Sequence, residues 1–215
     1  MPFSTWLSLT AACLVVSLTP GAGAVNTMTT SLLVGWRRSI WTILGQQLAL
    51  LLQIAITAAG LGAIVASNPQ LFTAIRYIGA GYLVFLGLRM MLSRVSDAPS
   101  TAQEEAAGGA AHAFGSSPAA MVRRGFWVNM SNPKAIVFLL AFMPLFISPH
   151  APQLPQYLIL AVTLVVGDVL VMWGGFALLA RSFKKLAANP RGQKALNVTF
   201  GLLFVAVAAL LLLPS

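Results

Sequence analysis

Long apolar runs separated by short polar segments cover most of the chain. A helix that crosses a bilayer needs roughly 20 apolar residues, and six runs approach or exceed that length. The runs occupy residues 3–35, 40–66, 71–92, 125–147, 155–180 and 196–213. The pattern predicts an all-α membrane protein with six transmembrane helices and no separate soluble domain.

The first run is too long for one simple span, and residues 17–31, SLTPGAGAVNTMTTS, interrupt it near its centre. We expect two half-helices with unwound backbone between them. Non-helical backbone is tolerated at membrane depth only where protein or a water-filled cavity satisfies its polar groups. The break therefore predicts part of a substrate site, formed by Thr19, Pro20, Gly21, Gly23 and Asn26.

An alternative interpretation of the first run is a cleaved signal peptide, because Ala22-Gly23-Ala24 has the form of a small-residue cleavage site. The first six residues contain no Lys or Arg, whereas secretory signals begin with positive charge. The apolar character also resumes after Ser31. Both features favour a retained span.

The fourth run is interrupted by Asn129-Met130-Ser131-Asn132-Pro133-Lys134, about as deep in its span as Pro20 is in the first. Paired Gly/Pro interruptions in two halves indicate the binding site of a transporter built from inverted repeats. We therefore expect helices 1 and 4 to be broken and add Asn129, Asn132 and Pro133 to the substrate site. The alternative is that each proline only kinks its helix. The predicted organisation is a three-helix repeat at 1–92, a flexible cytoplasmic linker at 93–122 and a second three-helix repeat at 123–215.

The chain carries a net charge of +9, with 58% hydrophobic and 8% charged residues. The basic residues are scattered between apolar runs without a basic face, which argues against nucleic-acid binding. They gather in the first, third and fifth connections, so the positive-inside rule places these in the cytoplasm and both termini outside. Arg76 does not fit this scheme, and snorkelling to the interface is its simplest role.

Asp168 is the one acidic residue within a predicted span, and its depth is similar to that of Lys134. A carboxylate near the bilayer centre is unfavourable by a few kcal/mol even on the lower scales, and it is therefore a candidate functional group. We predict that Asp168 and Lys134 couple transport to protons. A static ion pair between the fourth and fifth spans, or a Lys134 that snorkels, is the structural alternative.

Three glutamines add polarity to the second span. Gln47 and Gln53 are assigned to the substrate site, and Gln46 shares a helix face with Gln53; hydrogen bonds between helices are the alternative role. Cys13 is the single cysteine, and the sequence shows no His/Cys/carboxylate spacing for a metal. No metal site or cofactor is predicted.

Three stretches resemble the lysine exporter (LysE/RhtB) family: Thr19-Pro20-Gly21, residues 23–31 and residues 128–134. The resemblance covers nearly the whole chain except 93–122. Residues 23–31 are most similar to the branch that exports homoserine, homoserine lactone and threonine. The resemblance implies an exporter in the bacterial inner membrane, driven by the proton-motive force. Ala22 departs from the second proline of many relatives, and Gln53 stands where that branch often has His, so no ionisable role is carried over there.

The leading hypothesis is thus a proton antiporter that exports small neutral amino acids across the inner membrane, with both termini periplasmic. A passive channel or a structural membrane subunit is the second hypothesis. A membrane enzyme is disfavoured, because the spans offer no Ser/His/Asp set and no paired carboxylates. Nor does the chain contain a nucleotide-binding loop for primary transport. Small-residue helix faces are compatible with a homodimer.

Overall fold

The computed structural model describes residues 1–67, 69–93, 117–148, 151–187 and 189–212, and these form helices without any strand. The first half contains α1 (Phe3–Leu18), α2 (Ala22–Val34), a 3-10 turn (Arg37–Ser39), α3 (Ile40–Ser67) and α4 (Pro69–Leu92). The second half contains α6 (Pro118–Met130), α7 (Pro133–Phe142), a 3-10 turn (Met143–Phe146), α8 (Gln153–Val169), a π-helical segment (Leu170–Ala177), α9 (Ala180–Ala187) and α10 (Pro190–Leu212).

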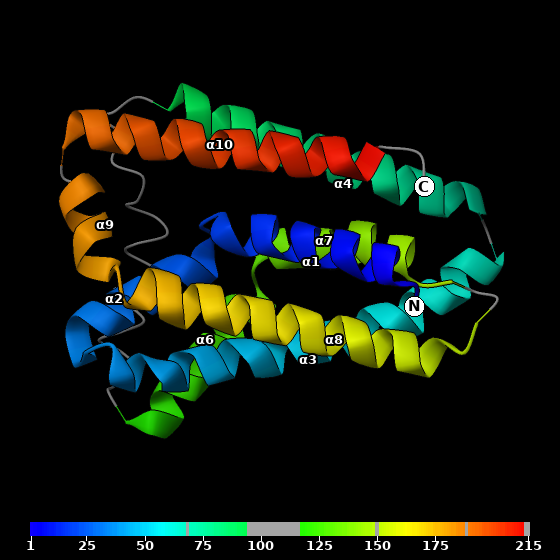
Figure 1. The fold of residues 1–215 in the computed structure, drawn as a ribbon, viewed down its shortest axis with the longest axis horizontal. Helices are drawn as coiled ribbons and strands as arrows, with labels where there is room; N and C mark the ends of the chain where they lie inside the picture. Colours follow the sequence, from blue (N-terminus) through cyan, green and yellow to red (C-terminus); the bar gives the residue numbers. More distant parts are fainter. Residues whose placement is uncertain (68, 94–116, 149–150, 188, 213–215) are drawn as a thin grey trace.

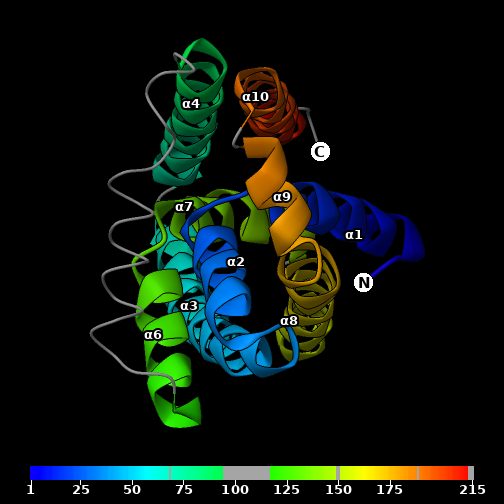
Figure 2. The ribbon, with the colours of Figure 1, turned by 90° about the vertical axis from the view of Figure 1, so that its left-hand side faces the viewer.

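Helices from the two halves pack against each other in pairs: α3 with α6, α1 with α8, and α4 with α10. The α4–α10 pair lies at one edge of the molecule, while α2, α3, α6 and α8 lie together on the other side (Figures 1 and 2). Helices α1 and α7 lie between these groups in Figure 1. The two halves are therefore interlocked rather than separate domains.

Both ends of the described chain lie at the same end of the molecule. In Figure 1 the start of α1 and the end of α10 are on the right, whereas the α2–α3 connection and α9 are on the left. Arg37 and Arg38 lie in that α2–α3 connection. The arrangement thus separates the termini from these basic residues, and the side of the membrane that each end faces stays a prediction.

Two glycines bring α3 and α6 into close contact. A Cβ atom on Gly45 would overlap the carbonyl oxygen of Val122, and one on Gly125 would overlap that of Thr42. Small residues at such positions allow helix backbones in membranes to approach closely. This reciprocal contact fixes α6 firmly on α3.

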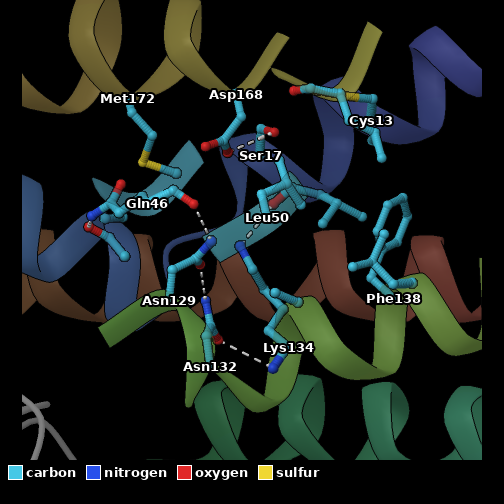
Figure 3. Close-up of a pocket in the computed structure, with 16 residues that line it drawn as sticks. Cys13, Ser17, Gln46, Leu50, Asn129, Asn132, Lys134, Phe138, Asp168 and Met172 are labelled. Atoms are coloured by element: carbon cyan, nitrogen blue, oxygen red, sulfur yellow. Dashed lines mark hydrogen bonds between the residues drawn. The ribbon is translucent and has the colours of Figure 1, made fainter. Parts of the chain in front are cut away.

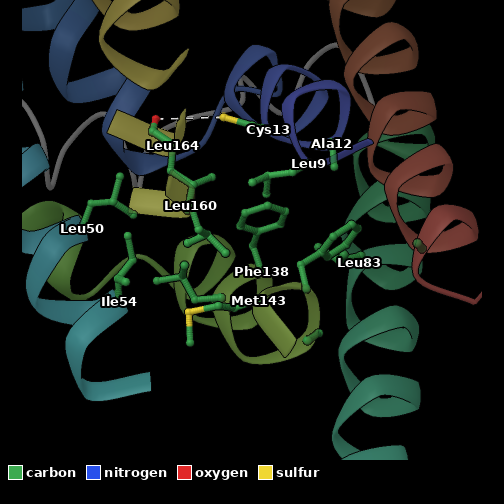
Figure 4. Packing of buried hydrophobic residues seen from close by; sticks show 14 of the residues in the cluster. Leu9, Ala12, Cys13, Leu50, Ile54, Leu83, Phe138, Met143, Leu160 and Leu164 are labelled. Atoms are coloured by element: carbon green, nitrogen blue, oxygen red, sulfur yellow. Dashed lines mark hydrogen bonds between the residues drawn. The ribbon is translucent and has the colours of Figure 1, made fainter. Parts of the chain in front are cut away.

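A buried apolar cluster joins α1, α3, α4, α7 and α8 (Figure 4). Leu9, Leu83, Leu139 and Leu160 are each 1% exposed within it. Large apolar side chains also cover the outer surface. On α8, for example, Leu158, Val162 and Val166 recur every fourth residue and are 58%, 62% and 51% exposed. Such a repeating apolar face on one helix is typical of contact with lipid.

By length and composition, two helical stretches can cross a membrane, Arg37–Gly60 and Gln153–Ala177, and each of two bent pairs can form one more span. Among the residues searched, Tyr77–Leu92 is a shorter apolar helix. The chain is thus a multi-pass membrane protein, and the count of six spans stays a prediction. The side chain of Arg76 lies outside the described residues.

The second half begins earlier than expected. Residues 94–116 of the predicted linker lie outside the described residues, but α6 starts at Pro118, so 118–122 are helical. The hydroxyl of Ser117 accepts a hydrogen bond from the Ala120 N–H, and proline occupies the first helical position. Both features stabilise a helix start. Arg124 is consequently not at a loop edge but inside a helix, where it is 3% exposed.

Candidate functional site

Two helix breaks form the centre of the candidate site. Helix α1 ends at Leu18, with Thr19 in an extended conformation, because the residue before a proline is disfavoured in a helix. The chain bends by 57° between α1 and α2, and by 56° between α6 and the segment that begins at Pro133. Both breaks lie where the sequence predicted them.

A cavity of about 50 Å³ lies between the breaks. Its polar walls come from α1, α3, α6, α7 and α8, as Figure 3 shows. The polar lining side chains are Ser17, Gln46, Asn129, Asn132, Lys134 and Asp168. On this measure about 10–15 Å³ is enough for one water, so the cavity has room for a few water molecules or a small polar group.

The carboxylate of Asp168 accepts two side-chain hydrogen bonds at the cavity wall. Gln47 Nε2 donates to Oδ2 at 2.7 Å, and the Ser17 hydroxyl donates to Oδ1 at 3.2 Å. These donors fix the orientation of the carboxylate without a full positive charge beside it.

Lys134 binds the open end of α1. Its ammonium donates to the backbone oxygens of Val16 at 3.0 Å and Thr19 at 2.6 Å. The last carbonyls of a helix lack partners within the helix and carry partial negative charge, which a cation stabilises. Lys134 and Asp168 face the same cavity, but the static ion pair considered from the sequence is not formed. Instead the two side chains bind neighbouring residues, Val16 and Ser17.

Amide side chains hold the second break against α3. Asn129 Nδ2 donates to the Gln46 backbone oxygen at 2.9 Å, and Asn132 Nδ2 donates to Asn129 Oδ1 at 3.4 Å. Gln46 in turn donates through Nε2 to the Gly23 carbonyl of α2 at 2.9 Å. A continuous polar network thus connects α2, α3, α6 and the break at Asn132.

The structure brings five predicted site residues to the cavity and places the others around it. Gly23, Asn129, Asn132, Lys134 and Asp168 line the cavity. Thr19, Pro20, Gly21 and Pro133 form the breaks themselves.

Three predicted residues have other positions. Gln47 binds Asp168 from behind the cavity wall. Gln53 donates to the Asn129 and Met130 carbonyls at the end of α6, at 3.1 and 3.3 Å. Asn26 is fully buried, and neither polar atom of its side chain has a hydrogen-bond partner.

Two polar lining residues were absent from the predicted site. Ser17 lies two residues before Thr19, and only its contact with Asp168 distinguishes it from other hydroxyls in the span. Gln46 was recognised as polar at depth on the face of Gln53, and it forms the link to Gly23. The available signal for Ser17 was its position three residues before Pro20, and for Gln46 it was the polarity of its side chain within an apolar span.

Comparisons with known proteins show the family to which the chain belongs. The family model of the LysE type translocator matches residues 14–215. The homoserine/homoserine lactone efflux protein of Salmonella typhimurium is 39% identical over 212 residues, 98% of this chain and 97% of that protein. An uncharacterized membrane protein of Vibrio cholerae is 36% identical over 211 residues, 98% of each chain.

A leucine efflux protein of an Enterobacter strain is 30% identical over 208 residues, which cover 95% of this chain and 92% of that protein. No solved structure matches this chain. The family match extends over both helix breaks and the cavity between them. The chain therefore belongs to the LysE translocator family, whose named relatives here are amino-acid efflux proteins.

Proposed function

We propose that the protein is a secondary exporter of small neutral amino acids and their derivatives, including homoserine, homoserine lactone and threonine, in exchange for protons. The observation that carries this proposal is the cavity between two helix breaks, with the Asp168 carboxylate in its wall. These substrates share an ammonium group, which a carboxylate binds. The relatives named as homoserine/homoserine lactone and leucine efflux proteins support this substrate class.

Coupling follows from competition at Asp168. The carboxylate can hold either a proton or the substrate ammonium but not both, because each neutralises the same negative charge. Gln47 and Ser17 donate to the carboxylate when neither is bound. A proton that binds from outside thus displaces the substrate, and a substrate that binds from inside displaces the proton.

The proposed movement is a change in the packing of the two breaks. We infer two inverted three-helix repeats, supported by bends of 57° and 56° and by the cross-packing of α1 with α8 and α3 with α6. Transporters of this plan expose a central site alternately to each side. In this proposal the protein lies in the inner membrane with both termini periplasmic.

Efflux of labelled homoserine from preloaded cells tests the proposal. The Asp168→Asn variant keeps the volume of the side chain but removes its charge, so we expect efflux to fall at least tenfold at an unchanged level of protein in the membrane. Glu104→Gln, which removes a carboxylate from the sequence segment predicted as a linker, is the matched control and should export normally.

Two outcomes oppose the proposal. Full efflux by the Asp168→Asn variant would exclude the coupling role. In proteoliposomes, the unaltered protein could also transport substrate at a rate that does not depend on a pH gradient and without counterflow. That result would favour the passive channel.

A further inference from the structure

Arg124 is a buried cation outside the cavity. It lies on α6, is 3% exposed, and donates through Nη2 to the Thr30 hydroxyl of α2. Its Nε has no hydrogen-bond partner. Asp168 is the one acidic residue among those the structure describes, and it binds Ser17 and Gln47 instead. A buried charge without a counter-charge is strongly unfavourable. Among the described residues, the Arg124 guanidinium therefore lacks both a counter-charge and a partner for its Nε.

Asn26, in the same region, is a second buried polar side chain without hydrogen-bond partners. It is 0% exposed, yet both its Nδ2 and its Oδ1 have no partner. Asn26 and Thr30 are four residues apart on α2 and therefore share a helix face. The Thr30 hydroxyl, which accepts from Arg124, donates to the Asn26 backbone oxygen at 2.7 Å. Buried polar groups in native proteins normally have partners, so two adjacent exceptions indicate a missing ligand.

The surrounding helices hold this cluster in place and connect it to the cavity. Close contact at Gly125 fixes α6 against Thr42 of α3, directly beside Arg124. The Thr42 hydroxyl also donates to that of Thr30 at 3.4 Å. Gly23, which lines the cavity, precedes Thr30 by roughly 10 Å along α2 at about 1.5 Å per residue. The cluster and the cavity thus lie along the same face of α2.

We propose that Arg124 and Asn26 form a second substrate subsite, which binds the carboxylate of the amino acid. This inference rests on the proposed function and deepens it. A guanidinium binds carboxylates through two parallel hydrogen bonds, and the Asn26 amide supplies a further donor. Because the ammonium and the carboxylate of an amino acid lie on one carbon, the two sites bind it in succession. Asp168 recognises the ammonium shared by all substrates, whereas Arg124 recognises the carboxylate, which homoserine has and homoserine lactone lacks.

The competing explanation is purely structural. In that case Arg124 holds α6 to α2 through Thr30, and its loss weakens the whole protein. Such a defect would reduce transport of every substrate alike. Homoserine and its lactone therefore separate the two explanations, because they differ in the free carboxylate, which is closed into a neutral ester in the lactone.

The test measures concentration-dependent transport of labelled homoserine and of freshly prepared homoserine lactone in proteoliposomes. We expect Arg124→Gln to raise the half-saturating concentration of homoserine at least about tenfold, the size of one lost charged hydrogen bond. Transport of the lactone should change less than twofold. Asn26→Leu should act in the same direction. Arg37→Gln removes an equal charge from an exposed position in the α2–α3 connection and should leave both substrates unaffected.

Equal losses for both compounds, or no loss for homoserine, would overturn the subsite. A loss confined to the lactone would overturn it as well. If the unaltered protein transports neither compound, the proposed function fails and the subsite fails with it. Lactone transport by the Arg124→Gln variant itself reports that the variant is folded.

Discussion

The two helix breaks bend the chain almost equally, by 57° and 56°, but different groups satisfy their backbones. At the first break the α1 carbonyls bind the charged Lys134, and no side chain caps the start of α2 at Gly21. At the second break the α6 carbonyls bind the neutral Gln53, and Asn132 caps α7 within its own segment. The second break thus has its own N-cap and a neutral donor from α3, whereas the first has no side-chain cap and depends on a charged residue from the other break.

This difference indicates which break moves. The start of α2 contributes Gly23 and Ala24 to the cavity and has no side-chain cap. Uncapped helix N-termini carry free N–H groups and partial positive charge, which suit an anionic group of a ligand. We expect the first break to rearrange during transport while the second stays fixed on α3 through Asn129 and Gln46.

The largest predicted effect is at Lys134. In Lys134→Met the carbonyls of Val16 and Thr19 lose a charged donor, so we expect the free energy of unfolding to fall by about 3 kcal/mol. Thermal unfolding of the purified protein in detergent measures the change. Lys134→Arg keeps donors at this position and should recover part of the loss. A Lys134→Met protein as stable as the unaltered one would show that the first break does not depend on this side chain.

A smaller effect is predicted at the matching position of the second break. Gln53→Met removes the neutral donor to the Asn129 and Met130 carbonyls, and we expect a loss of about 1 kcal/mol in the same unfolding measurement. Gln153→Met removes an exposed amide at the start of α8 and serves as the control. If Gln53→Met destabilises the protein more than Lys134→Met, then the second break, and not the first, depends more strongly on its side-chain donor.

The smallest effect concerns the cap of α7. Asn132 Oδ1 accepts from the Lys134 backbone N–H at 3.1 Å. Asn132→Ala should reduce stability by about 1 kcal/mol or less, whereas Asn132→Ser should retain the cap. Equal stability of these two variants would mean that this break does not need its N-cap.

The breaks were predictable because their cause is local. Proline lacks an N–H and restricts the residue before it, so Pro20 and Pro133 predict helix ends wherever they lie in a fold. Polar partners for Asp168 were also predictable, because an isolated carboxylate in an apolar run is unfavourable without them. Its partners Gln47 and Ser17 belong to other helices and came from the structure.

The contacts between helices were not predictable from depth alone. Sequence spacing gives the height of Lys134 in its span but not the direction of its side chain, which points to α1 carbonyls rather than to Asp168. Gln46 and Gln47 are adjacent yet face different helices, because successive residues diverge by about 100° around a helix. Arg124 was assigned to a loop edge because its apolar run begins at Gly125, although Ser117-Pro118 was a helix-start signal.

The central claim is that a proton and a substrate ammonium compete for Asp168, and proton movement driven by homoserine tests it most directly. Proteoliposomes with a pH-sensitive dye inside receive homoserine outside, with no initial pH gradient. We predict that homoserine enters, protons leave and the interior becomes more alkaline, whereas the Asp168→Asn protein gives no pH change. Uptake of homoserine by the unaltered protein without any change of internal pH would contradict the claim.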